Sequence, residues 1–422
     1  MKQLPLIFTL LLVASPAWAG DSAGLQDRLY DQYGLEASGF IEARGGLRTQ
    51  DNPYEKEESL AEARLQLDLS KDMDLAIIRL KGDIYGDAVV DEYAAELREF
   101  NVSFSPLDSM DVKVGRQILT WGTGDMLFIN DMFPKDWQSF FIGRDDEYLK
   151  APADAIKSSL FTELINIDLV WTPIFDPSNH ISGQRLSYWN SGLNRIAGRD
   201  YIFGVTKRDT LWDDSEVSVR ISRNIGSKEF AIYGYSGFWK EPEGMDPASG
   251  NLRYPRLSVY GASLRAPLAK GIANIEAGYY DSRQDRDGTD PATRNSESRL
   301  LVGYEQELSR NFTGGLQYYL ELMDDYEAYK ASQPAPWRDE LRHMLTMRLT
   351  RLMMNQNLIL TLFTYYSPSD HDGHTRLRAT YKLDDHWLLE TGANLFLGEE
   401  EHTFWGQFEE NSNVFIACRL SF

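Results

Sequence analysis

The residues whose types and spacing could support catalysis are scattered along the chain. Residues 234–237 read GYSG, one residue short of the G-x-S-x-G pattern that presents a nucleophilic serine on a sharp turn. None of the six histidines lies in an H-E-x-x-H sequence, which would hold zinc beside a general base. A Ser/His/Asp site built from distant residues stays open as an alternative, because such triads need no fixed spacing. We expect a protein that is not an enzyme.

Patterns for metal binding are equally weak. Residues 370–374 read DHDGH, which could hold a divalent ion weakly but is more typical of a solvated hairpin turn. Residues 285–288 (DRDG) resemble part of a calcium loop, yet Arg283 and Arg294 stand where acidic ligands are needed. Cys418 is the single cysteine, which excludes an intrachain disulfide and a cysteine zinc cluster. We expect no metal and no cofactor.

The balance of charge narrows the classes of partner. The 422 residues carry 64 Asp and Glu against 43 Lys and Arg, a formal net charge of −21. A nucleic-acid binder presents a basic face, so we expect no nucleic-acid partner. Hydrophobic residues make up 42% and the mean hydropathy is −0.41, values that give no support to a helical membrane protein.

Many ionisable side chains occupy every second position of otherwise apolar segments. Residues 61–69 read AEARLQLDL, with Ala and Leu on one face and Glu, Arg, Gln and Asp on the other. The same alternation recurs at 217–222, 312–321 and 376–383. A period of two residues is that of a β-strand whose faces meet different surroundings. The charged residues are therefore expected to lie on strands with one wet face and one apolar face.

Segments of this kind number about 18 and are about 10–14 residues long, the length that a tilted membrane-spanning strand needs. A barrel of 16 strands is the alternative. The predicted spans are 37–48, 57–70, 73–85, 94–105, 110–120, 155–163, 167–175, 215–224, 228–239, 255–266, 271–281, 297–308, 311–323, 339–352, 357–367, 374–383, 386–397 and 411–422.

The connections between these segments alternate in length. After even-numbered segments they are short, such as 71–72 and 384–385, and after odd-numbered segments they are longer and polar, such as 49–56 and 324–338. This segregation is typical of bacterial outer-membrane barrels. In lipid every backbone N–H and C=O must be paired, and a closed sheet has no free edge. The predicted fold is all-β: a transmembrane antiparallel up-and-down β-barrel over 37–422, with short periplasmic turns and long extracellular loops.

Both chain ends indicate export to a bacterial outer membrane. Residues 1–19 have a basic residue, a short apolar run and an A-x-A site, the pattern of a cleaved signal peptide; an uncleaved anchor is the alternative. Residues 20–36 are predicted to form a short periplasmic segment. The last strand alternates apolar residues up to Phe422, which resembles the signal by which barrels are recognised for assembly. We expect an outer-membrane location, with membrane lipid, lipopolysaccharide and the barrel-assembly machinery as partners.

If one face of each strand meets lipid, the opposite face lines a lumen. So many ionisable groups there imply water inside, because burying charges in a dry interior is very costly. Basic residues concentrate on the last strands, where a basic stripe would attract anionic or polar solutes. Alternatively, these arginines pair with carboxylates of the lumen and stiffen the wall. The predicted pore-lining residues are Arg342, Arg348, Arg376, Arg378, Lys382, Arg419, Glu305, Glu307 and Glu321.

The segment 121–154 is too long and too aromatic for an exposed loop. We predict that it folds inward and narrows the pore; an extracellular cap packed on neighbouring loops is the alternative. Loop 176–214 is a second candidate, as a lid. The predicted constriction residues are Arg116, Trp121, Asp125, Asp131, Trp137, Arg144 and Asp145.

The run 114–122 (VGRQILTWG) resembles a G-R-Q-x-x-x-W-G pattern of proteobacterial porin-like barrels, among them the alginate-export type and related uncharacterised families. The layout of the whole mature chain is similar to theirs. The resemblance implies an 18-stranded channel with an arginine-rich lumen. Alternation alone puts Arg116 on the face of Val112 and Val114, so a bulge near Gly115 would be needed to turn it inward.

Together these features predict a porin-like outer-membrane channel that passes polar or anionic small solutes or oligomers through a charged lumen. Two alternatives stay open. One is an export conduit that works with a periplasmic or inner-membrane transporter, and the other is a barrel lipid hydrolase. A transporter with an N-terminal plug domain is not expected, because few residues precede the first predicted strand.

Overall fold

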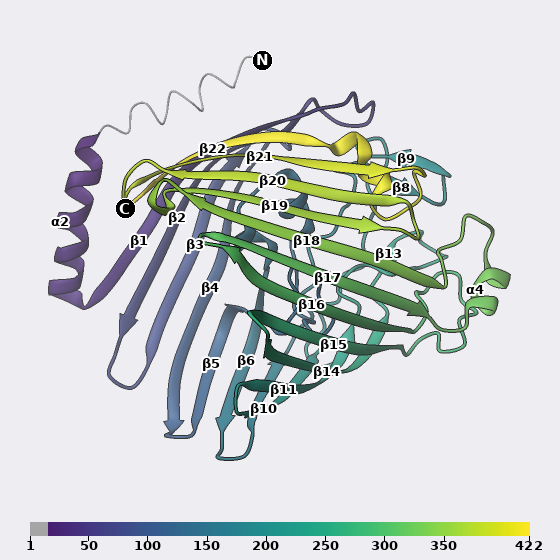
Figure 1. Ribbon diagram of the computed structural model, residues 1–422, viewed down its shortest axis with the longest axis horizontal. Helices are drawn as coiled ribbons and strands as arrows, with labels where there is room; N and C mark the ends of the chain where they lie inside the picture. The colour runs from purple at the N-terminus through teal and green to yellow at the C-terminus, as the bar shows by residue number, and fades with distance from the viewer. Residues whose placement is uncertain (1–15) are drawn as a thin grey trace.

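The computed structural model describes residues 16–422, and its main element is a closed antiparallel β-barrel of 18 strands (Figure 1). Strands that follow one another in the chain pair side by side. The barrel closes where β1 (Leu35–Arg48) pairs with β22 (Asn413–Ser421), in a register that sets Glu42 opposite Arg419. Closure leaves no edge strand unpaired, which a membrane-spanning sheet requires.

The remaining barrel strands follow the order of the chain around the wall. They are β2 (Glu58–Asp72), β3 (Ile77–Asp87), β4 (Glu92–Leu107), β5 (Met110–Ile118), β6 (Pro152–Phe161), β7 (Asn166–Thr172), β10 (Glu216–Ile225), β11 (Lys228–Phe238), β14 (Arg256–Leu268), β15 (Gly271–Ser282), β16 (Glu297–Ser309), β17 (Phe312–Met323), β18 (Leu341–Met353), β19 (Leu358–Ser367), β20 (Asp372–Lys382) and β21 (Trp387–Gly398).

Short elements lie outside the barrel sheet. Among the described residues, no helix is long and apolar enough to cross a membrane. The helices are α2 (Pro16–Tyr33), α3 (Trp137–Ile142), α4 (Tyr326–Ser332), η1 (Asp146–Leu149), η2 (Met354–Gln356) and η3 (Gly406–Asn411). Two small hairpins are formed by β8 (Tyr188–Asn190) with β9 (Arg195–Ala197) and by β12 (Gly244–Met245) with β13 (Leu252–Arg253).

The two ends of the barrel differ, as the spacing of the strands predicted. One end, called here the short-turn end, carries tight connections such as 108–109 and 310–311. The other, the long-loop end, carries the connections 119–151 and 173–215. Helix α2 and the C-terminus lie at the short-turn end, whereas α4, β8 and β9 lie at the opposite end (Figure 1).

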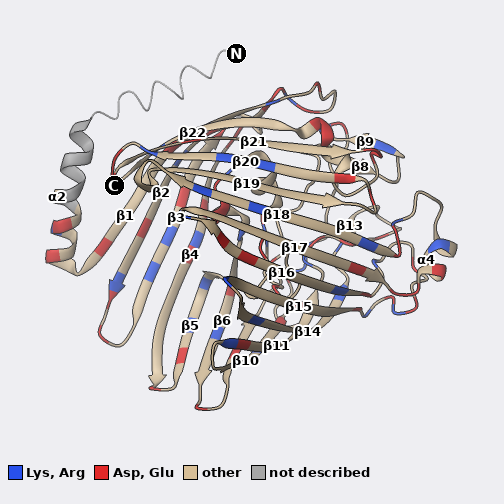
Figure 2. Cartoon of the chain, viewed as in Figure 1, with Lys and Arg blue, Asp and Glu red and all other residues tan. Residues whose placement is uncertain are grey.

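Side chains alternate between the two faces of the wall. On β11, Ile232 is 56% exposed and the next residue, Tyr233, is 8% exposed; on β17 the values are 63% for Leu316 and 8% for Gln317. The exposed rows are mainly apolar because they face the lipid side, and the opposite rows line the lumen. Charged residues are spread along most of the strands, as Figure 2 shows. The alternation places most of them inside.

The predicted antiparallel barrel of 18 strands is confirmed, and the alternative of 16 strands is wrong. The predicted strand ends shift by a few residues. β1 begins inside the predicted segment 20–36, because Leu35 already pairs with Lys71. β6 begins inside the predicted loop 121–154, because Pro152 pairs with Ile118.

The predicted signal peptide 1–19 is mostly outside the described residues, which begin at residue 16. Residues 16–19 form the first turn of α2, and the helix continues to Tyr33. Signal cleavage after residue 19 stays a prediction.

Candidate channel constriction

Loop 119–151, which joins β5 to β6, lies inside the barrel rather than over its end. Side chains of β15 to β19 bind its first half. Side chains of β1, β4 and β20 bind its second half. The loop is therefore fastened to opposite parts of the wall and crosses the lumen.

One wall carboxylate organises the first half of the loop. Glu276 of β15 is 1% exposed and accepts hydrogen bonds from the backbone N–H groups of Thr123, Gly124 and Asn130, at 2.8, 3.2 and 2.7 Å. The Thr123 hydroxyl and Asn130 Nδ2 donate to the same carboxylate, at 3.1 and 3.0 Å. A buried carboxylate is stable only when such donors replace water. We call this group of contacts the Glu276 clasp.

The clasp continues at Asp125, whose backbone and side chain are both bound to the wall. Gln317 of β17 accepts from the Asp125 N–H at 2.7 Å and donates to its carbonyl at 2.8 Å. The Asp125 carboxylate pairs with Arg348 of β18 through two nearly parallel hydrogen bonds, one of them 2.8 Å. Tyr365 of β19 donates to the carbonyl of Met126 at 2.8 Å. The two hydrogen bonds between Arg348 and Asp125 fix the guanidinium and the loop relative to each other.

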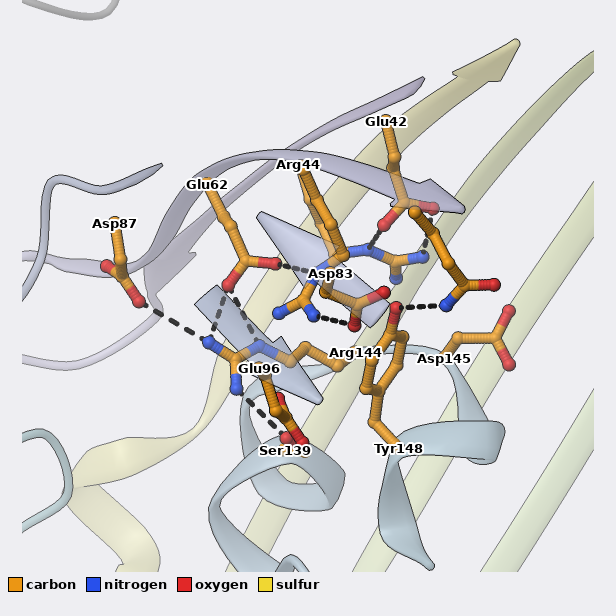
Figure 3. Close-up of polar contacts among 12 residues, drawn as sticks. Glu42, Arg44, Glu62, Asp83, Asp87, Glu96, Ser139, Arg144, Asp145 and Tyr148 are labelled. Atoms are coloured by element: carbon orange, nitrogen blue, oxygen red, sulfur yellow. Dashed lines mark hydrogen bonds and ion pairs between the residues drawn. The ribbon is translucent and has the colours of Figure 1, made fainter. Parts of the chain in front are cut away.

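Arg144 anchors the second half of the loop to the opposite wall. Its guanidinium donates to Glu62 of β2 and, at 3.0 Å, to the hydroxyl of Ser139 (Figure 3). Burial disfavours the charged guanidinium, but the nearby Glu62 carboxylate outweighs burial and raises the pKa of Arg144. Arg44 of β1 donates to the carbonyl of Gly143 at 2.6 Å, where the chain turns with φ 88°. A side chain at Gly143 would collide with the ring of Phe415.

Two consecutive acids of the loop meet the basic wall. Asp146 pairs with Arg376 at 2.7 Å and with Arg378 at 2.8 Å. Asp145 pairs with Arg419 at 3.1 Å. Burial alone would raise the pKa of Asp145, but Arg419 and Arg378 outweigh it and lower the value to about 2. Asp145 therefore stays ionised over the physiological range.

The middle of the loop is apolar. In α3, Phe140, Phe141 and Ile142 are at most 2% exposed. Phe141 packs against Phe396 of β21 and Phe408 of η3, with ring centroids 5.3 and 5.1 Å apart. Aromatic side chains of loop and wall thus fill the lumen beside α3. Solutes cannot pass through this packed region while α3 is docked.

Two of the cavities beside the loop share lining residues. The larger, about 490 Å³, is lined by loop residues 120–126 and by wall residues that include Arg265, Asn274 and Glu305. The smaller, about 60 Å³, is lined by Arg376 and Arg378 together with Phe140. Arg348, Met126 and Asp146 line both cavities. The Arg348–Asp125 pair therefore stands at their border.

Of the predicted basic pore-lining residues, five pair with carboxylates. Lys382 is exposed and forms no ion pair with any residue in 16–422. The pairs are Arg342 with Asp370, Arg348 with Asp125, Arg376 and Arg378 with Asp146, and Arg419 with Glu42 and Asp145.

The three predicted pore-lining glutamates have different surroundings. Glu305 is exposed and lines the larger cavity. Glu307 accepts from the N–H of Asn311 at 2.9 Å and so stabilises the turn between β16 and β17. Glu321 is 6% exposed and pairs with Arg294 and Arg338 near the long-loop end.

Arg116 corrects the predicted constriction set, because it points away from the lumen. It lies on β5, in register with Phe100 of β4, which is 53% exposed, and with Asp154 of β6. Its guanidinium pairs with Asp154 at 3.1 Å. Gly115 does have a left-handed φ of 117°, but the register continues through it, so Arg116 stays on the outer face.

The remaining predicted constriction residues do belong to loop 119–151. Trp121 packs against Phe133 with ring centroids 5.0 Å apart and lines the larger cavity. Asp131 pairs with Lys135 at 3.0 Å, and burial, only partly offset by that pair, lowers the pKa of Lys135. Trp137 begins α3 and packs against Phe141. These residues stabilise the loop itself.

Loop 173–215, which contains the predicted lid 176–214, packs on the long-loop side of the constriction. Arg185 pairs with Asp87 of β3 and donates to the carbonyl of Ser59 at 3.1 Å. Asn411 of η3 donates to the carbonyl of Ser187 at 2.9 Å. These contacts join the loop to β2 and β3 of the wall and to η3 at the rim.

The predicted sets do not include Glu276, Gln317 or Arg44, which hold the loop backbone. Alternation already places Glu276 in the lumen, but its partners lie more than 140 residues away, at Thr123 and Asn130. No pattern of neighbouring residues predicts a contact between residues so far apart in the chain. Within residues 16–422, no three His, Cys, Asp or Glu side chains are grouped as ligands of a metal ion.

Comparison with known proteins identifies the fold and no narrower family. No family model and no curated protein sequence matches the chain. Three solved structures cover 92% of it: OccAB1 of Acinetobacter baumannii (8% identity, 97% of that chain, TM-score 0.56), and OccK5 (8%, 97%, 0.55) and OccK11 (9%, 96%, 0.52) of Pseudomonas aeruginosa. The resemblance to the alginate-export type stays a prediction. The chain has the porin-like fold of a bacterial outer-membrane β-barrel.

Proposed function

We propose that this protein is an outer-membrane channel for small polar or anionic solutes, with loop 119–151 as its constriction. The observation that carries the proposal is the larger cavity, about 490 Å³ of lumen that ends at the Arg348–Asp125 pair. Its lining holds ionised groups of both signs, which require water or a polar solute beside them. If this part of the lumen had only a structural role, it would be packed as densely as the region around α3.

Local charge favours anions at the border of the two cavities. The linings of the two cavities hold five basic residues, Lys150, Arg265, Arg348, Arg376 and Arg378, against the three acids Asp125, Asp146 and Glu305. Even with Glu390, which lies 3.7 Å from Arg378, this leaves an excess of positive charge in a confined space of low dielectric, where it acts more strongly than in water. Small anionic or polar solutes are therefore the expected cargo.

Conductance of the purified protein in planar bilayers tests the proposal. We expect ion conduction, with a reversal potential in a salt gradient that indicates a preference for anions. Replacing both Arg376 and Arg378 by Gln should shift the reversal potential toward cation selectivity. Arg310→Gln, in the exposed turn between β16 and β17, is the matched control and should leave it unchanged. The absence of any ion current in the wild-type protein would refute the channel.

An export conduit is the second candidate, favoured by the position of the larger cavity. Its lining includes Arg265 and Ile272, which lie on either side of the tight turn between β14 and β15. The cavity is therefore on the short-turn side, which faces the periplasm in an outer-membrane barrel. A periplasmic or inner-membrane transporter would deliver cargo to this side. Higher conductance for solute added there than for solute added opposite would support this direction.

A further inference from the structure

Helix α3 is docked against the wall through a group of aromatic rings that surround His374. His374 lies on the lumen side of β20 and is 1% exposed. It stacks on Phe396 of β21, with ring centroids 4.4 Å apart and planes 9° apart. Phe140 and Phe141 of α3 meet its ring edge to face, each at 5.8 Å. Tyr365 and Trp405 complete the enclosure at 5.9 and 5.1 Å. We call these five rings the His374 cage.

In the docked conformation the imidazole makes no hydrogen bond that would stabilise a second proton. Within residues 16–422, neither ring nitrogen of His374 makes a hydrogen bond. Asn394 of β21 lies beside the ring, and its Oδ1 also lacks a donor. A neutral imidazole tolerates this apolar enclosure, whereas an imidazolium would have two donors to satisfy.

The charged groups around the cage do not compensate a second proton. Arg376, two positions along the lumen face of β20, carries a positive charge, which repels an imidazolium. The Asp372 carboxylate accepts the backbone N–H of Trp405 at 2.6 Å. The groups that face the ring are Arg376 and Asp372 from β20, Tyr365 from β19, Asn394 and Phe396 from β21, Phe140 and Phe141 from α3, and Trp405 from the loop 399–412.

We infer that His374 is an acid-sensitive latch: its protonation releases α3 from the wall and opens the lumen. The stacked rings would attract an imidazolium by cation–π interaction. Burying that ion without hydrogen bonds has a larger cost in free energy. The cost exceeds the attraction, so the protonated side chain favours a conformation in which α3 has moved and water reaches the ring. Phe140 and Phe141 are the rings that leave when α3 is released, because the other rings belong to the wall or its rim. Release also breaks the hydrogen bond from Asn413 Nδ2 to the carbonyl of Phe141, 3.0 Å long in the docked form.

Proton linkage sets the size of the effect. A solvated histidine titrates near pH 6.5, whereas the docked ring lacks the water and the hydrogen bonds that stabilise a second proton. Below pH 6.5 one proton favours the released state up to tenfold for each unit by which the pH falls. The device would admit solutes in acidic surroundings and restrict them at neutral pH.

The test compares wild-type protein with His374→Phe, which keeps an aromatic ring in the cage and cannot be protonated. Conductance through the proposed channel should rise when the pH falls from 7.5 to 5, and the variant should not respond. His371→Asn is the matched control, because His371 is exposed in the turn that precedes β20 and its φ of 51° suits Asn. A second control is Glu241→Gln. Burial, aided by Glu243, raises the pKa of Glu241 to about 7, so this variant separates an effect of Glu241 titration from the effect of His374 protonation. Both controls should keep the acid response.

Hydrogen exchange of the amides in 137–142 tests release without relying on conduction, which rests on the proposed function. At pH 5, wild-type amides should exchange at least tenfold faster than those of His374→Phe, and at pH 7.5 the two proteins should agree. Equal exchange at pH 5, or full acid activation of His374→Phe, would overturn the latch. Silent bilayers combined with the expected exchange difference would refute the channel and retain the latch.

Discussion

The two halves of loop 119–151 are attached to the wall in different ways. In residues 123–130, wall side chains bind the loop backbone, through the Glu276 clasp and the two hydrogen bonds of Gln317. In residues 137–146, wall side chains such as Arg44 and Asn413 also bind the backbone, but most contacts come from loop side chains. These are aromatic packing in the His374 cage and ion pairs of Arg144, Asp145 and Asp146.

This difference separates the roles of the halves. Glu276 and Gln317 hold the backbone of the first half directly and at several points, so the first half is a fixed support. Side-chain anchoring depends on a buried histidine and on salt bridges, so the second half can be released. The border between the halves lies beside the Arg348–Asp125 pair, which would be retained when α3 moves.

Removing the Glu276 clasp should have the largest effect. The first half of the loop would become mobile, so it would no longer differ from the second half. Glu276→Ala leaves one buried and two partly buried N–H groups without an acceptor, at a cost on the order of 5 kcal/mol in loop docking. Hydrogen exchange of the amides in 123–130 should rise by several orders of magnitude. Glu305→Gln, an exposed lumen acid on the adjacent strand β16, should leave that exchange unchanged. Unaltered protection in Glu276→Ala would show that other contacts hold this half.

Truncating the cage should have the next largest effect and should affect the other half alone. Phe141→Ala removes a 2% exposed ring that contacts Phe396 and Phe408, at a cost of about 3 kcal/mol. We expect faster exchange in 137–142 and higher conductance at neutral pH, with 123–130 still protected. Phe100→Ala, on the lipid face of β4, should change neither quantity. Loss of protection in both halves together would mean that the loop is one cooperative unit.

The wall of this barrel was predictable because its pattern is local. Alternation over ten residues identifies a strand, and it also assigns the outer face to Arg116 correctly. The resemblance around 114–122 argued for turning Arg116 inward, and the register with Phe100 and Asp154 contradicts that. Where a periodic pattern and a short motif disagreed, the periodic pattern was right, because every residue of the strand contributes to it.

The attachment of the loop was not predictable, because it joins residues far apart in the chain. Asp125 was expected at the constriction and Arg348 on the wall, but nothing local indicates that they pair across 223 residues. His374 lies in a segment that reads as a solvated turn, and it is buried because loops 119–151 and 399–412 bring aromatic rings to it. The aromatic composition of the loop predicted that its side chains are buried. It did not predict which residues bury them, because those residues lie on distant strands and loops.

The ion pairs of the releasable half provide the smallest and most specific effect. Because Arg419 and Arg378 lower the pKa of Asp145 to about 2, below an ordinary value of about 3.9, the pairs stabilise docking at any pH above about 4. That contribution, about 2 kcal/mol, is lost as the pH falls through 2. Asp145→Asn keeps the side-chain acceptor that caps η1 but removes the charge, so docking should weaken at pH 7 and match the wild type near pH 2. Asp108→Asn in an exposed turn is the control, and thermal melting followed at both pH values measures the difference. A deficit that persisted at pH 2 would mean that Asp145 acts through packing rather than charge, and the releasable half would then depend on His374 and its cage for all of its response to acid.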